Sequence, residues 1–123
     1  MVVLTLFTGG ENIYPLEIEE RLMAHPSISR AIVVGLKDQH YGEVVGAFVE
    51  LAEGRRQPND TQLQDWVKSV LGKHKSPRHI FWLGQGPVPT SVPLTGSGKV
   101  KKFEMAKLGD ELLQKKQSVA SKL

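Results

Sequence analysis

The pattern of apolar and polar residues along the chain predicts two β-strands joined by a long loop. Residues from Ile28 to Leu36 are apolar and rich in β-branched side chains, as in a central strand of a sheet. A polar segment from Lys37 to Gly42 follows, and the stretch from Glu43 to Leu51 is again mostly apolar. We expect these two strands to form an antiparallel hairpin, and we expect a third strand from His79 to Leu83.

Helices are predicted on either side of these strands. Pro15 stands where the first residue of a helix is favoured. This helix should end before Pro26, because a residue that precedes proline resists helical geometry. A last, basic helix should run from about Lys101 or Phe103 to about Lys116. Its expected buried positions are Ala106, Leu112 and Leu113.

The strongest helical period lies between the second and third strands. Apolar residues recur there with the spacing of one helix face, at Leu63, Trp66, Val67, Val70 and Leu71. Thr61 and Gln64 have the spacing of a capping box, and Gly72 is a favoured stop. Helices and mostly antiparallel strands in this order predict one small α+β domain, in which a three-stranded sheet packs against helices.

Composition narrows the classes of function. The 123 residues suffice for one domain, and 40% hydrophobic residues favour a folded chain. The absence of cysteine excludes disulfides, and the four histidines lack the spacing of metal ligands, so we expect no metal site. The net charge of +3 comes without an aromatic platform, so we expect no nucleic-acid binding. No apolar run has the length of a membrane span.

A lysine ends a stretch rich in glycine, serine and threonine, from Pro93 to Lys99. Glycines let such a loop turn sharply near a ligand, and an ammonium suits phosphate or carboxylate oxygens. An ordinary surface turn explains the composition equally well. A Walker phosphate loop is excluded, because Pro93 and Val100 stand where glycine and Ser or Thr are required. The segment Gly84-Gln85-Gly86 is followed by prolines, which excludes a dinucleotide fingerprint.

Several segments, in order and in register, resemble motifs of the superfamily of AMP-forming acyl-CoA synthetases, adenylation domains and luciferases. They are Gly9 to Glu19, His25-Pro26 followed by Ala31 to Gly35, Lys75-Ser76-Pro77, and Pro93 to Lys99. The resemblance covers residues 9–113 and implies the small, mobile C-terminal lid domain of that superfamily. Residues 1–8 lack the charged hinge residue that the family commonly has, so we expect them not to match. Residues 114–123 are expected to form an exposed tail.

The resemblance also implies roles for individual residues. A large N-terminal adenylation domain, joined to the lid or separate from it, binds ATP, magnesium and a carboxylic acid in this family. Lys99 matches the lysine that bridges the acid and the nucleotide during adenylation. Lys75 and Arg78 are expected near the phosphates of CoA. The loop expected to line the tunnel for the pantetheine arm of CoA consists of Gly9, Gly10, Glu11 and Asn12.

The resemblance leaves more than one function open. In the leading interpretation the chain is part of an acyl-CoA ligase that uses ATP and CoA, releases AMP, and is inactive without the large domain. The alternatives are a separate binding module that docks on an adenylation domain, and an inactive remnant.

The last three residues, Ser121-Lys122-Leu123, match a peroxisomal import signal. A soluble import receptor reads this signal from a free C-terminus. We therefore expect that receptor as a partner and the peroxisome as the location.

Overall fold

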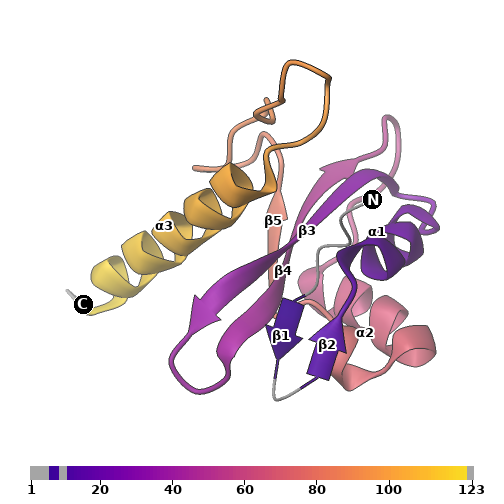
Figure 1. Ribbon diagram of the computed structural model, residues 1–123. Helices are drawn as coiled ribbons and strands as arrows, with labels where there is room; N and C mark the ends of the chain where they lie inside the picture. The colour runs from indigo at the N-terminus through magenta and orange to yellow at the C-terminus, as the bar shows by residue number, and fades with distance from the viewer. Residues whose placement is uncertain (1–5, 9–10, 122–123) are drawn as a thin grey trace.

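The computed structural model describes residues 6–8 and 11–121, which form a short strand pair, a three-stranded sheet and three α-helices (Figure 1). No helix in these residues is both long and apolar enough to span a membrane. The elements in chain order are β1 (Leu6–Thr8), β2 (Glu11–Ile13), α1 (Pro15–Met23), β3 (Ile28–Asp38), β4 (Gly42–Leu51), α2 (Asp60–Leu71), a 3-10 turn (Lys73–Lys75), β5 (His79–Trp82) and α3 (Lys102–Ser121).

The central sheet has the strand order β3-β4-β5, which confirms the predicted α+β class. β3 and β4 pair in antiparallel register, with Ala31 opposite Val49 and Asp38 opposite Gly42. β5 pairs with β4 in parallel, and His79 lies opposite Gly46. Parallel neighbours cannot be joined by a tight turn, so the chain crosses between β4 and β5 through α2.

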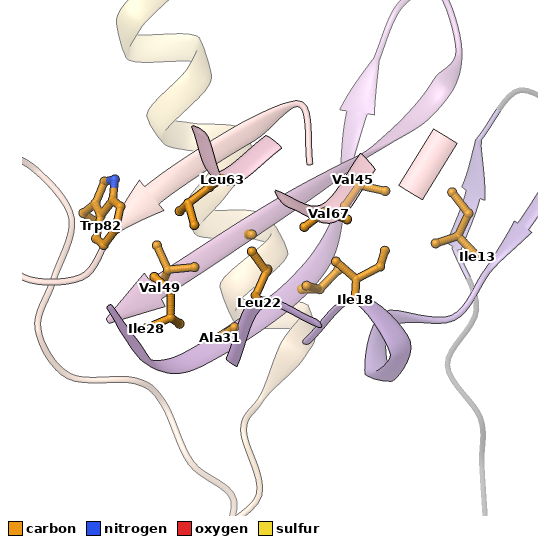
Figure 2. Close-up of a cluster of buried hydrophobic side chains, with 12 residues drawn as sticks. Ile13, Ile18, Leu22, Ile28, Ala31, Val45, Val49, Leu63, Val67 and Trp82 are labelled. Carbon is orange, nitrogen blue, oxygen red and sulfur yellow. The ribbon is translucent and has the colours of Figure 1, made fainter. Parts of the chain in front are cut away.

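Helices cover both faces of the sheet. The face toward α1 and α2 carries a cluster of buried side chains that includes Ile18, Leu22, Leu63 and Val67 (Figure 2). A second cluster, built around Phe48 and including Met105 of α3, fills the opposite face. A strand that is buried on both faces needs apolar residues at successive positions, which explains the continuous apolar run in β3.

The N-terminus of α2 differs from the sequence prediction. The side chain of Asn59 accepts a hydrogen bond from the Gln62 N–H at 2.8 Å, and Gln62 Oε1 accepts one from the Asn59 N–H at 2.9 Å. The capping box is therefore Asn59 with Gln62, and the prediction of Thr61 with Gln64 was wrong. Both pairs have the required spacing, but asparagine is at least as good a cap as threonine. The Gln64 amide instead donates to the Pro77 carbonyl.

One residue of the predicted apolar face of α2 is not buried. Leu63 and Val67 are fully buried, but Val70 is 63% exposed. Val70 lies near the end of the helix, and the buried stripe of α2 is narrower than its apolar stripe. Such an exposed valine provides a control for surface substitutions.

The last helix runs to Ser121, beyond the expected end near Lys116. Leu112 is buried as predicted, whereas Ala106 and Leu113 are only half-buried. The fully buried Met105, which the sequence analysis missed, anchors the first turn of α3. The start of this helix is therefore fixed on the sheet immediately after the lysine-bearing stretch.

Candidate functional site

The stretch from Pro93 to Lys101, called the lysine loop below, is a hydrogen-bonded turn. The Lys101 N–H donates to the Pro93 carbonyl at 2.9 Å, and the Thr95 N–H donates to the Lys99 carbonyl at 2.7 Å. The Gly98 N–H donates to the Thr95 carbonyl, and Gly98 has a φ of +85°, which favours glycine. The backbone thus holds one shape without a packed core beneath the tip of the turn.

Side chains of the lysine loop stabilise the same turn. Thr95 Oγ1 accepts a hydrogen bond from the Lys99 N–H at 3.1 Å and forms another with Ser97 Oγ at 3.0 Å. The side chain of Lys99 is exposed. In the described part of the chain its ammonium makes no ion pair, unlike those of Lys75 and Lys102. A cation on a shaped loop without an internal partner is available to an external anion.

A buried polar junction fixes the chain directly after the lysine loop. The Lys102 ammonium donates to Glu19 Oε2 at 2.8 Å and to the Val33 carbonyl at 3.2 Å. The same Glu19 oxygen accepts the Val33 N–H at 2.9 Å. Lys102 and Glu19 are 23% and 12% exposed. This junction connects α1, β3 and α3 and sets the point from which the lysine loop projects.

A shallow basic hollow of about 280 Å³ lies at the start of β5. Its lining residues are Tyr41, Val44, Val45, Lys73, His74, Ser76 and Arg78. The Arg78 guanidinium lies 4.9 Å from the centre of the Tyr41 ring. Three basic side chains beside an aromatic ring suit an anionic ligand that carries a planar group.

The turn between β3 and β4 holds Tyr41 in place. Asp38 Oδ2 accepts hydrogen bonds from the backbone N–H groups of Tyr41 at 2.8 Å and His40 at 3.0 Å. The bond from Tyr41 is the main reason that the pKa of Asp38 lies below its usual value. The carboxylate therefore stays ionised at neutral pH and keeps the turn closed.

The predicted CoA-contacting residues do not all lie together. Arg78 lines the hollow, whereas the Lys75 ammonium contacts both carboxylate oxygens of Glu17, at 3.1 and 3.2 Å. Lys75 thus ties the turn after α2 to helix α1. The tunnel loop begins at Gly9 and Gly10, which lie outside the described residues. Its remaining residues, Glu11 and Asn12, belong to strand β2 instead of a loop.

The lysine loop and the basic hollow lie at opposite ends of the sheet. The first turn of α3 contacts β3 at Val33, and Asp110, two turns later, accepts the Lys37 N–H at 2.9 Å. α3 therefore runs along β3 from the lysine loop toward the turn that carries Tyr41 (Figure 1).

Sequence reasoning missed part of the hollow. Lys73 and His74 precede the motif lysine, and their charge alone did not distinguish them from surface residues. Tyr41 is more than thirty positions away, and only the parallel pairing of β4 with β5 brings it to Arg78. That pairing leaves no local signal in the sequence.

Comparisons with known proteins identify relatives of this chain. The family described as AMP-binding enzyme C-terminal domain matches residues 17–99. Acyl-CoA ligase sidI of Beauveria bassiana is 72% identical over 116 residues, which are 94% of this chain and 20% of that protein. Acyl-CoA ligase SID4 of Ajellomyces capsulatus is 53% identical over 109 residues, 88% of this chain and 18% of that protein.

A solved structure gives the same answer. The acyl-CoA synthetase of Brucella canis has a TM-score of 0.77 and 32% identity, over 89% of this chain and 20% of that protein. The chain spans about a fifth of the length of these relatives.

Proposed function

The chain belongs to the family of AMP-binding enzyme C-terminal domains, and we propose that it is the mobile lid of an ATP-dependent, AMP-forming acyl-CoA ligase. One observation carries this proposal. Lys99 is exposed on a hydrogen-bonded loop and makes no ion pair among the described residues. Its proposed role is to enter the active site of a large adenylation domain that supplies the rest of the site.

The chemistry of adenylation explains why a lysine is needed. The carboxylate of the acid attacks the α-phosphorus of ATP, a bond to phosphorus forms, and pyrophosphate leaves. Two anionic groups approach each other in this step, so a cation fixed between them stabilises the transition state. The Lys99 ammonium can donate to oxygens of both groups, since it carries three hydrogen-bond donors.

We assign the binding of ATP, magnesium and the carboxylic acid to the large domain. Within residues 6–8 and 11–121, no group of three or more His, Asp or Glu side chains is arranged to hold a metal ion. The contribution proposed for this chain is the Lys99 ammonium.

A second orientation of the lid would serve the transfer to CoA. The hollow lined by Arg78, Lys73 and His74 carries the positive charge that CoA phosphates require, and Tyr41 offers a ring for stacking. Its place at the far end of the sheet supports a lid that rotates between the two steps. Gly9, Gly10, Glu11 and Asn12 remain the proposed lining of the tunnel for the pantetheine arm, and Lys75 remains a predicted contact of the CoA phosphates.

Recombination of the two parts tests the proposal. The large domain of the Beauveria bassiana relative, without its own C-terminal region, is mixed with this chain, and ATP–pyrophosphate exchange is measured with a panel of carboxylic acids. We expect this chain to restore exchange and the Lys99→Ala chain to bind without restoring it. Restoration by Lys99→Ala would overturn the role of the lysine. Binding without any restoration favours the alternative of a docking module, and no binding favours an inactive remnant.

The chain by itself should not catalyse the reaction. Incubation of the chain with ATP, CoA and the same acids should release no pyrophosphate above background. Turnover by the isolated chain would contradict the proposal that a separate large domain binds ATP and the acid.

We also propose that Ser121-Lys122-Leu123, at a free C-terminus, directs the protein to peroxisomes. Lys122 and Leu123 lie outside the described residues, and the proposal depends on the sequence. A fluorescent reporter that ends with the last ten residues of the chain should accumulate in peroxisomes of fungal cells. A diffuse cytosolic signal would contradict it, and deletion of Leu123 provides the matched control.

A further inference from the structure

Two large apolar side chains, one within the lysine loop and one directly after it, are exposed. Phe103 is 88% exposed and Leu94 is 51% exposed, whereas Phe48 is fully buried in the core. Such a large exposure of a phenylalanine ring is unfavourable, because it leaves much apolar surface in contact with water. The exposure of two apolar side chains so close to Lys99 requires an explanation.

The backbone fixes both residues relative to Lys99. Leu94 pairs with Val100 in an isolated β-bridge, so it lies across the turn from the residue that follows Lys99. Phe103 is the second residue of α3, whose start is held by the buried ion pair of Lys102. The Lys101–Pro93 hydrogen bond closes the segment that contains Leu94 and Lys99, and Phe103 follows this segment by two residues.

Phe103 cannot turn into the core of this chain. Met105, two positions later, is fully buried on the side of α3 that contacts the sheet. Two positions correspond to a rotation of about 200° around a helix axis, so Phe103 projects from the opposite side. The ring therefore stays exposed for as long as α3 is docked.

We propose that Phe103 and Leu94 are apolar anchors that seat the lysine loop on the adenylation domain. The occupant of this surface is an apolar rim around the entrance of the pocket that holds ATP and the acid. The inference depends on the proposed function: if Lys99 enters that pocket, residues at the base of its loop must contact the surface around the entrance. About four-fifths of the length of the relatives lies outside this chain, which provides that surface.

The anchors should act in one orientation of the lid only. The basic hollow lies near the turn between β3 and β4, whereas Leu94 and Phe103 lie near the start of α3, at the other end of its path along β3. We therefore expect the anchors to leave the large domain when the hollow faces it. A substitution of Phe103 should therefore slow adenylation and spare the transfer of the acyl group to CoA.

A chimera provides the test. This chain replaces the C-terminal region of the Beauveria bassiana relative, and the acid is the member of a panel from acetate to palmitate that the unsubstituted chimera activates best. Adenylation is followed by ATP–pyrophosphate exchange, and the second step by thioester formation from the prepared acyl-adenylate and CoA. We expect Phe103→Ser to lower exchange by about tenfold or more, as for the loss of a buried aromatic contact, with thioester formation unchanged. Leu94→Ser should have the same selectivity with a smaller effect.

Controls separate this inference from folding and from the proposed function. Val70→Ser removes another exposed apolar side chain, on α2, and should change neither step. Phe103→Leu keeps an apolar anchor and should keep most of the exchange activity. Equal losses in both steps, or no loss with Phe103→Ser, would overturn the anchors. If Lys99→Ala abolishes exchange while Phe103→Ser does not, only the anchors fail; if Lys99→Ala has no effect, the proposed function fails.

Discussion

The lysine loop and the junction that follows it place two lysines three positions apart in opposite environments. Lys102 is mostly buried, donates to Glu19 and to a backbone carbonyl, and connects α1, β3 and α3. Lys99 is exposed, and only its backbone takes part in the hydrogen bonds of the loop. Both lysines belong to the same basic stretch of the sequence, but only the structure shows that one ammonium is paired and the other exposed.

The difference follows from what each ammonium requires, if Lys99 has the role proposed above. A buried ammonium must be paired, because an unpaired charge away from water is costly. An ammonium that acts in another protein must be unpaired before it arrives, since an internal partner would compete with the substrate. The junction therefore fixes the base of the loop, and the loop leaves its cation free to bind.

The largest expected effect comes from Lys99→Ala in the chimera. Loss of the cation should reduce ATP–pyrophosphate exchange by about 100- to 1,000-fold, comparable to the loss of one group that stabilises transition-state charge. The free energy of unfolding should not change, because Lys99 makes no ion pair in the described part of the chain. Denaturant unfolding and exchange kinetics measure the two effects. Lys107→Ala, which removes an exposed charge of α3, is the matched control and should leave both unchanged.

The opposite result is expected for Lys102→Met. This change leaves the Glu19 carboxylate without its ammonium partner at a site that is only 12% exposed. The free energy of unfolding should fall by about 2–3 kcal/mol, somewhat less than for a fully buried pair. A second substitution, Glu19→Gln, should restore part of the loss, because it removes the unpaired charge. A double-mutant cycle in urea checks this, and purely additive losses would show that the two residues are not coupled.

A smaller effect is expected for Gly98→Ala. Gly98 has a φ of +85°, and a Cβ at this position would have open space around it, so the cost of alanine is the backbone conformation alone. The expected loss is about 1 kcal/mol, and it falls on the lysine loop and not on the core. Exchange activity in the chimera should drop more than thermal stability. Gly96→Ala, where alanine meets neither a positive φ nor a contact, should have little effect on either.

The smallest expected effect is a loss of stability at low pH, which we attribute to His25 on the face of the sheet that α1 and α2 cover. His25 Nδ1 accepts the Ser27 N–H at 3.0 Å, and its ring packs against Trp66. Burial, and then the nearby Arg21, lower the pKa of His25 below 6.5. The unfolded chain therefore binds a proton more readily, so stability is complete above pH 6.5 and declines as the pH falls through the lower folded pKa. Urea unfolding between about pH 7.5 and 5 should show this decline, and His25→Gln should reduce it.

The sequence predicted much of the fold because the relevant signals are local. The apolar run of β3, the proline at the start of α1 and the helical period around Leu63 each depend on neighbouring residues. Two pairs of residues had the spacing of a capping box at the start of α2. In the structure the N-cap is Asn59 and not Thr61. The family motif indicated Lys99 as the functional lysine, and its exposure is consistent with that role.

The sequence could not predict what depends on distant pairs. The partner of Lys102 is Glu19, more than eighty positions earlier, and Tyr41 reaches Arg78 only through the sheet. Likewise, Lys75 belongs to a recognisable motif, but only the structure shows that Glu17 occupies its ammonium. Exposure of Phe103 depends on which face of α3 packs on the sheet, and the buried residues expected from the sequence did not include Met105.

The parallel pairing of β5 with β4 has a consequence for the order of folding. β3 and β4 meet across a short turn, whereas Gly46 must find His79 about 33 residues away, after α2 has formed. Closing that long segment has an entropic cost that local pairing avoids. We therefore expect β5 and α3 to join the folding nucleus late. During synthesis, the lysine loop would thus acquire its shape only after β5 and α3 have both left the ribosome.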